Sequence, residues 1–164
     1  MSINRLMFIA TSVRSAPSTR RSFSIVDAET TLAESHPVSS AKTAIKGALK
    51  RDKAYLKDLQ TLGAEHGATG EVEEVAGGLG SLMEETLNKA ESEGADSDFY
   101  EAHAVLLNLK RKQKDSAGGM LKIARAEKDT KLRDAAKEFE RAQKEMAKTL
   151  ATELAGYAVQ IAKG

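Results

Sequence analysis

The strongest constraint on the fold of this chain is a long apolar stripe near its C-terminus. From Leu132 to Ile161 the apolar residues recur every three or four positions, and Gly156 is the only glycine or proline between positions 120 and 162. This spacing predicts an amphipathic helix. An unbroken helix over residues 120–162 would be roughly 64 Å long, which would make it the largest element of the protein.

Three shorter helices are predicted ahead of this stripe. Apolar spacing favours helices over residues 41–62, 71–93 and about 98–116. Residues 24–40 mix serine, threonine and acidic residues and contain a proline, so we expect an extended arm there. No alternating run of β-branched residues indicates a strand. The predicted fold is all-α: a helical hairpin or small bundle with one long C-terminal amphipathic helix over about 120–162.

Local signals suggest where the third helix begins and where it breaks. Asp98 is followed by Glu101 three residues later, a spacing that predicts a capping box at the start of that helix. Gly118 and Gly119 predict a hinge or break before the long helix. The residues alone leave open whether 98–162 forms one helix or two that are broken at this glycine pair.

The first 23 residues differ in composition from the rest of the chain. They carry four arginines and many serines and threonines, but no aspartate, glutamate or lysine. On a helix their apolar side chains would share one face, a combination typical of an organellar targeting segment. We therefore expect a mitochondrial presequence over residues 1–23, with a plastid address or a disordered basic tail as alternatives. The helical domain would occupy residues 41–164.

A short motif closes this segment. Arg21-Ser22-Phe23-Ser24 resembles the mitochondrial processing-peptidase site, in which an arginine lies two residues before a cleaved aromatic–serine bond. The resemblance implies cleavage after Phe23, so that the mature chain begins at Ser24. The mature protein would then lie in the mitochondrial matrix or at the periphery of the inner membrane.

Few residues in this sequence support catalytic or cofactor chemistry. The chain has no cysteine and no tryptophan, and only 4% of its residues are aromatic. This composition excludes thiolate chemistry and cysteine zinc sites and leaves little material for a ligand pocket. His36, His66 and His103 each lack a second metal ligand at helical spacing. We expect a non-catalytic protein without a cofactor or metal ion.

One dense basic run stands out, formed by Lys110, Arg111, Lys112 and Lys114. At the end of a predicted helix it could simply complement the helix dipole, or it could contact a partner or anionic lipid. No aromatic residue interleaves with it, so nucleic-acid binding is not expected. No apolar run is long enough to predict a transmembrane span.

The apolar stripe of the predicted long helix exceeds what three shorter helices could cover. We therefore expect its distal part to contact another subunit, with Tyr157 as the strongest contact. The expected interface residues are Met146, Leu150, Leu154, Tyr157 and Ile161.

These features favour a non-catalytic accessory subunit of a mitochondrial inner-membrane or matrix assembly, such as ATP synthase or a respiratory complex. One alternative is a helical regulator or inhibitor of the mitochondrial ATP synthase. Another is a peripheral protein that lies on a lipid surface. The residues do not determine which complex is involved, the copy number, or whether the role is structural or regulatory.

Overall fold

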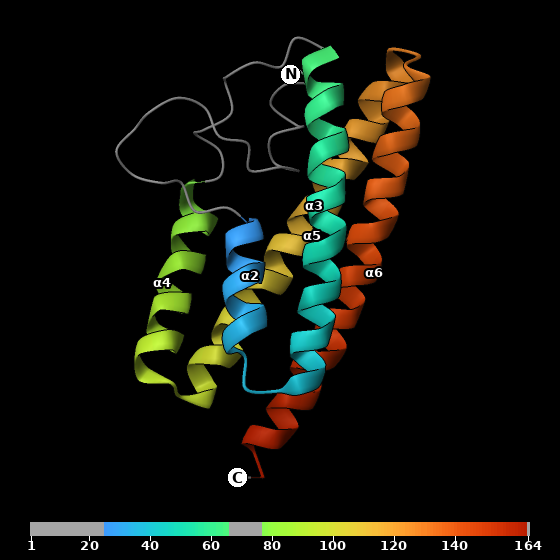
Figure 1. Cartoon of the computed structure of the whole chain (residues 1–164). Helices are drawn as coiled ribbons and strands as arrows, with labels where there is room; N and C mark the ends of the chain where they lie inside the picture. Colours follow the sequence, from blue (N-terminus) through green and yellow to red (C-terminus); the bar gives the residue numbers. More distant parts are fainter. Residues whose placement is uncertain (1–24, 66–76, 164) are drawn as a thin grey trace, which may run out of the picture.

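A computed structural model describes residues 25–65 and 77–163. Over these residues the chain is all-α, as predicted, and contains no strand. None of the described helices is long and apolar enough to cross a lipid bilayer. The helices, in chain order, are α2 (Ile25–Ser35), α3 (Ser39–Glu65), α4 (Gly77–Glu93), α5 (Asp96–Ala126) and α6 (Thr130–Ile161) (Figure 1).

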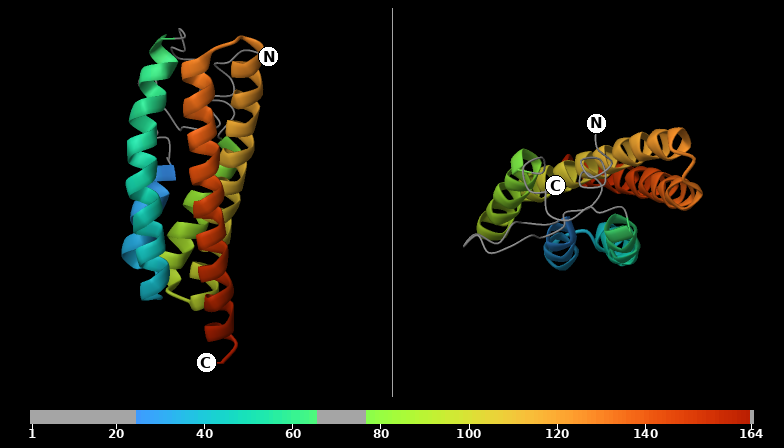
Figure 2. Two further views of the ribbon diagram at one scale, coloured as in Figure 1. Left: turned by 90° about the vertical axis from the view of Figure 1, so that its right-hand side faces the viewer. Right: turned by 90° about the horizontal axis from the view of Figure 1, so that it is seen from above.

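The helices form a ring of four with a fifth packed outside. α5 and α6 make an antiparallel hairpin, α3 lies against α6, and α2 closes the ring by contacting both α3 and α5. α4 packs outside the ring against α5 and α2, and it does not contact α3. Seen from above, α2 and α3 form one layer and the α5–α6 hairpin lies behind them (Figure 2).

The first of these helices corrects the prediction of an extended arm over residues 24–40. α2 buries Ala28, Leu32 and Ala33 against its neighbours. Its hydroxyl side chains stay compatible with the helix by turning back onto its own backbone: Thr30 Oγ1 donates to the Val26 carbonyl at 2.7 Å. The prediction was wrong for Ile25–Ser35 because burial of this apolar face outweighs weak helix propensity.

The boundary between α5 and α6 also differs from the prediction. α5 runs without interruption through Gly118 and Gly119, so the predicted break is wrong. A Cβ at Gly118 would lie 3.5 Å from Glu140 Oε1, which shows how near α6 packs at this point. The chain reverses further on, where Lys128 adopts a φ of 57°. The expected helix over 120–162 is therefore shared between two antiparallel helices.

A side-chain cap marks the start of α6 but not that of α5. The Asp129 carboxylate accepts from the Leu132 N–H at 2.9 Å and caps α6. α5 starts after Ala95 and has no side-chain cap. The predicted cap at Asp98 is wrong, because this residue lies inside the first turn, where its buried carboxylate pairs with Lys89 Nζ at 2.8 Å.

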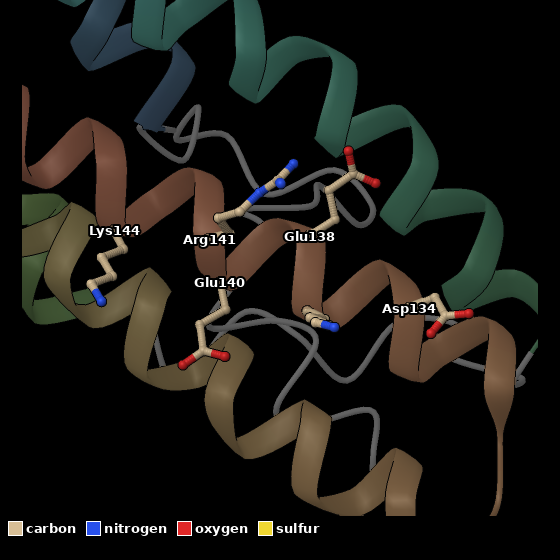
Figure 3. A pocket seen from close by; sticks show the side chains of 6 residues that line it. Asp134, Glu138, Glu140, Arg141 and Lys144 are labelled. Atoms are coloured by element: carbon tan, nitrogen blue, oxygen red, sulfur yellow. The ribbon is translucent and has the colours of Figure 1, made fainter.

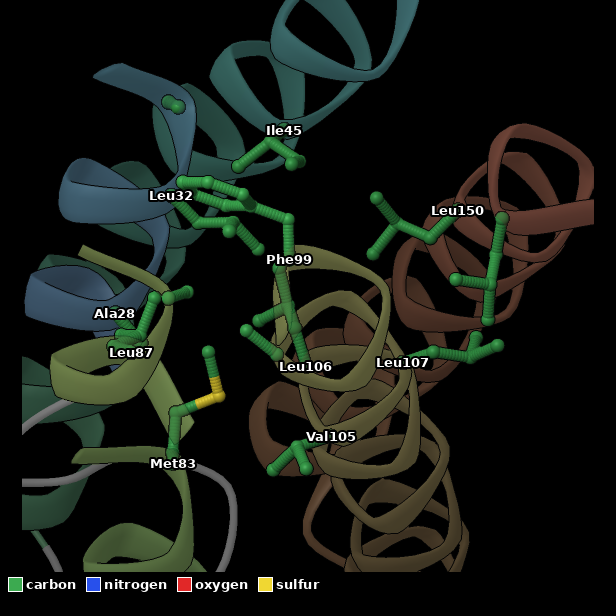
Figure 4. Close-up of a cluster of buried hydrophobic side chains, with 14 of the residues drawn as sticks. Ala28, Leu32, Ile45, Met83, Leu87, Phe99, Val105, Leu106, Leu107 and Leu150 are labelled. Atoms are coloured by element: carbon green, nitrogen blue, oxygen red, sulfur yellow. The ribbon is translucent and has the colours of Figure 1, made fainter. Parts of the chain in front are cut away.

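Two apolar clusters fill most of the bundle interior. In the larger one, side chains from all five described helices meet, among them Leu32, Ile45, Met83, Leu106 and Leu150 (Figure 4). The second cluster lies toward the α5–α6 turn and is richer in alanine. It consists of Ala117, Met120, Leu121, Ala124, Leu132, Ala136 and Phe139.

Candidate functional site: two buried polar networks

The densest group of buried charges lies between the two apolar clusters along α5 and α6. Lys110 Nζ pairs with Glu29 Oε1 at 2.5 Å and with Asp52 Oδ2. Gln143 Nε2 donates to the other oxygen of Asp52 at 2.9 Å. These four residues, which we call the ion cluster, come from α5, α2, α3 and α6, so each helix of the ring contributes one. All four are buried, and Lys110 has no exposed surface.

Burial and charge shift the titration of this cluster. Desolvation raises the pKa of Glu29 to about 7, and the nearby Asp52 charge adds to the rise while Lys110 opposes it. Burial alone would lower the pKa of Lys110, but the charges and hydrogen bonds of Asp52 and Glu29 together raise it. One lysine thus faces two carboxyl groups, and the group that takes up a proton near neutral pH is Glu29.

A lysine beside carboxyl groups can in principle support acid–base chemistry. Here the whole cluster is enclosed: Lys110, Glu29 and Gln143 are 0% exposed and Asp52 is 4% exposed. A substrate could reach Lys110 only if the helices separated. In the closed bundle the cluster therefore acts on the helices themselves, because each of its contacts joins two of them.

The second network is a chain of hydrogen bonds through two buried histidines. The Val38 N–H donates to His36 Nδ1 at 3.1 Å. His36 Nε2 lies 3.2 Å from His103 Nδ1, and His103 Nε2 lies 3.0 Å from the Leu150 carbonyl oxygen. We call these two side chains and their two backbone partners the histidine relay.

The direction of each hydrogen bond in the relay follows from its first member. Because His36 Nδ1 accepts from Val38, the proton of a neutral His36 is on Nε2, which donates to His103. His103 therefore carries its proton on Nε2 and donates to Leu150. Every ring nitrogen is satisfied while both rings are neutral. Burial lowers the pKa of His103 and lowers that of His36 to about 4, assisted by the neighbouring His103 and Lys42.

Aromatic side chains enclose the relay at the end of the bundle. The Tyr157 ring centre lies 5.0 Å from that of His36, and the Phe99 ring centre lies 6.2 Å from it. The Tyr157 hydroxyl donates to the carbonyl and carboxylate oxygens of Asp96 at 2.9 and 3.0 Å. Burial, together with Asp96, raises the pKa of Tyr157 above its usual range.

The structure revises the interface that was predicted on the C-terminal helix. Met146, Leu150, Leu154 and Tyr157 are 0–9% exposed within the described bundle. The chain covers them itself because α6 folds back along α5 and meets α3, an arrangement that the idea of one continuous 43-residue helix did not include. They are not free for a partner, and of the five predicted residues only Ile161 is exposed.

The predicted basic patch is also broken up. Lys110 is buried in the ion cluster, whereas the next residue, Arg111, is exposed. Lys112 and Lys114 are half-buried, and Lys114 pairs with Asp115 at 2.8 Å. The four basic side chains of this run therefore point in different directions around α5 and do not form one surface. The predicted processing site, Arg21, Phe23 and Ser24, lies outside the described residues.

An open hollow runs along α6, and each of its described lining residues is charged. Glu138 and Arg141 project on the α3 side, while Glu140 and Lys144 project toward α5 (Figure 3). Ligand sites are mostly apolar and enclosed, so this mixed-charge surface does not resemble one. Within the described part of the chain, no group of three or more histidines or acidic residues is placed to hold a metal ion.

The sequence analysis predicted neither network, although the ion cluster left a trace in the sequence. Asp52 interrupts the apolar stripe of its helix, and Lys110 and Gln143 occupy core-facing positions. A polar residue in such a register indicates a buried partner, but it does not identify that partner.

Comparisons with protein-family models, with curated proteins and with solved structures find no match to this chain.

Proposed function

We propose that this protein is a non-catalytic helical subunit of a mitochondrial assembly in the inner membrane or matrix. The observation that carries the proposal is that its most reactive buried groups bind one another across helices. Lys110 and the two histidines are 0% exposed. Lys110 binds residues of two other helices, and His103 on α5 contacts His36 in the α2–α3 connection and Leu150 on α6. They hold a bundle together, as a scaffold requires. The mitochondrial location is supported by the composition of residues 1–23.

A contact with other subunits is supported by the free end of α6. This end projects beyond α2 and α3 (Figure 1), and its Val159 and Ile161 side chains are 52% and 36% exposed. The docking surface that the sequence analysis placed on the C-terminal helix is therefore limited to the last turns of α6. The buried leucines of α6 are not suitable for testing it, because a charge at Leu150 or Leu154 would disrupt the core.

The test is native-gel separation of mitochondria from cells that express the tagged full chain. We expect it to co-migrate with a large assembly at a fixed ratio; a protein that migrates only as a free monomer would contradict the subunit role. Dissociation with pH or energy state would favour the alternative of an ATP synthase regulator. Val159→Asp/Ile161→Asp should weaken co-migration, while the matched control Thr152→Asp/Gln160→Asp, at exposed polar positions of α6, should not.

A further inference from the structure

We propose that the outer face of α3 binds the anionic headgroups of a phospholipid bilayer. Five lysines on this helix are separated by four, four, three and four residues, so they share one face. On a helix this stripe is roughly 22 Å long. We call it the lysine stripe: Lys42, Lys46, Lys50, Lys53 and Lys57.

The charges of this stripe are available to a ligand. Lys46, Lys50, Lys53 and Lys57 are exposed, and none of them forms an ion pair with a residue in the described ranges. Lys42 is half-buried, and its Nζ donates to the Glu34 carbonyl oxygen at 2.9 Å. Within the described ranges, the exposed lysines of the stripe therefore carry positive charge that no ion pair neutralises.

The single sign of charge is particular to α3. α6 carries as many basic side chains, but nearly as many acidic ones alternate with them. The acids of α3 lie elsewhere: Asp52 is buried in the ion cluster, and Asp58 and Glu65 lie off the stripe. Exposed acids gather instead on α4, which does not contact α3.

The position of the stripe suits a flat surface. α3 lies in the layer formed with α2, apart from the α5–α6 hairpin (Figure 2). The exposed lysines lie on a different side of α3 from its buried Ile45 and Ala48. The stripe follows α3, which runs along the long axis of the bundle. Contact along the whole stripe would place that long axis parallel to the bilayer.

The chemistry of the stripe favours lipid over other anionic partners. It contains lysine alone and lacks the bidentate arginines that read bases and the aromatic side chains that stack on single strands. Lysine is also depleted at protein–protein interfaces. Attraction to anionic lipid needs only charge near the surface, and each lysine there raises the binding constant about fivefold. The nearby Arg51 lies off the stripe, 3.8 Å from Glu145.

This membrane contact goes beyond the proposed subunit role and does not depend on it, because purified protein is sufficient for the test. Flotation would use the full chain with vesicles of phosphatidylcholine alone or mixed in equal parts with phosphatidylglycerol. The test variant is Lys46→Gln/Lys50→Gln/Lys57→Gln. The control, Lys137→Gln/Lys144→Gln/Lys148→Gln, removes the same charge from exposed positions of α6. Both variants keep the basic residues 1–23, so a difference in vesicle binding between them measures the contribution of the α3 lysines.

We expect binding only to the mixed vesicles, weaker at high salt, and on the order of 100-fold weaker for the α3 variant. The α6 control should bind like the parent, and circular dichroism should show equal helix content in all three proteins. Equal vesicle binding by the two variants would overturn the proposal. So would an α3-dependent affinity for duplex DNA, or an α3-dependent self-association, without any effect on vesicles.

Discussion

The ion cluster and the histidine relay both join helices inside one bundle, yet they differ in charge and in how completely they are paired. In the ion cluster one lysine faces two carboxyl groups, and Glu29 Oε2 and Gln143 Oε1 have no hydrogen-bond partner among the residues that the structure describes. In the relay every ring nitrogen of His36 and His103 has a partner. A charged network tolerates the loss of one member poorly, whereas a neutral chain loses only its local hydrogen bonds.

Breaking the ion cluster should have the largest effect on stability. Lys110→Met leaves the Glu29 and Asp52 carboxyl groups buried without a counter-charge, and we expect the free energy of unfolding to fall by about 3–5 kcal/mol. Urea denaturation followed by circular dichroism measures the change. Some of this loss will be relieved by protonation of Glu29, so the deficit should be smaller at low pH than at high pH.

The matched control replaces the whole cluster by apolar side chains: Glu29→Met, Asp52→Leu, Lys110→Met and Gln143→Met. Removing all the buried polar groups together should restore stability to within about 1–2 kcal/mol of the parent. If the quadruple variant were as unstable as Lys110→Met alone, the loss of stability would come from packing, and the electrostatic explanation would be wrong.

Interrupting the histidine relay should lower the free energy of unfolding by less than breaking the ion cluster does. His103→Leu leaves the Nε2–H of His36 without a partner in a buried site and removes the additional bond that the Leu150 carbonyl accepts, and we expect a loss of about 2–3 kcal/mol. The same denaturation experiment measures it. The double change His36→Leu/His103→Leu should cost less than the sum of the two single changes, because they remove one shared hydrogen bond. A loss at neutral pH as large as that of Lys110→Met would contradict the distinction between the two networks.

The two networks should respond to pH in opposite directions. The pKa of His36 falls from 6.5 to about 4 on folding, so the unfolded chain binds more protons in that window and acid destabilises the fold. Burial also lowers the pKa of His103 on folding, although the Leu150 carbonyl and Glu153 oppose this shift, so His103 adds to the loss of stability in acid. The pKa of Glu29 rises from 4.5 to about 7, so the folded chain binds more protons there and acid stabilises it.

Variants separate these contributions when unfolding is measured from pH 7 to pH 4.5. The parent should lose stability modestly as the pH falls, since two histidines oppose one glutamate. Glu29→Gln should lose it more steeply, whereas His36→Leu/His103→Leu should gain stability on acidification. A parallel pH dependence in all three proteins would show that other groups control the titration.

The smallest expected effect lies at the edge of the relay. Tyr157→Phe removes the hydrogen bonds to Asp96 but keeps the ring that packs against His36, and we expect a loss of about 1 kcal/mol in thermal or urea unfolding. Tyr157→Ala should cost about 3 kcal/mol or more, because it also leaves a cavity. Equal losses would mean that the ring contributes nothing to the enclosure of His36.

The regular parts of the fold could be read from residue spacing. The apolar positions predicted a helix over residues 41–62, and α3 occupies Ser39–Glu65. Local signals failed where packing opposed them. Gly118 and Gly119 were expected to interrupt the chain, but the close α5–α6 contact keeps them helical at a cost of roughly 1 kcal/mol each. The hydroxyl-rich α2 was missed for the same reason.

The candidate sites were harder to predict, because they depend on which helices meet. Lys110 was assigned to a surface patch from its basic neighbours, although its core-facing register places it opposite Glu29 and Asp52. His36 and His103 showed no ligand spacing in the sequence, and they meet only through the fold. The lysine stripe, by contrast, depends only on helical spacing within α3.

The sequence by itself determined that this protein is helical, that its C-terminal region is amphipathic, and that residues 1–23 differ in composition from the rest. These properties depend on spacing and composition, which are local. Only the tertiary structure decided that α6 covers its own apolar face against α5 and α3, and that four helices meet at Lys110. A helical pattern specifies which side of a helix is buried but not what buries it, and the partner is chosen by packing across the whole bundle.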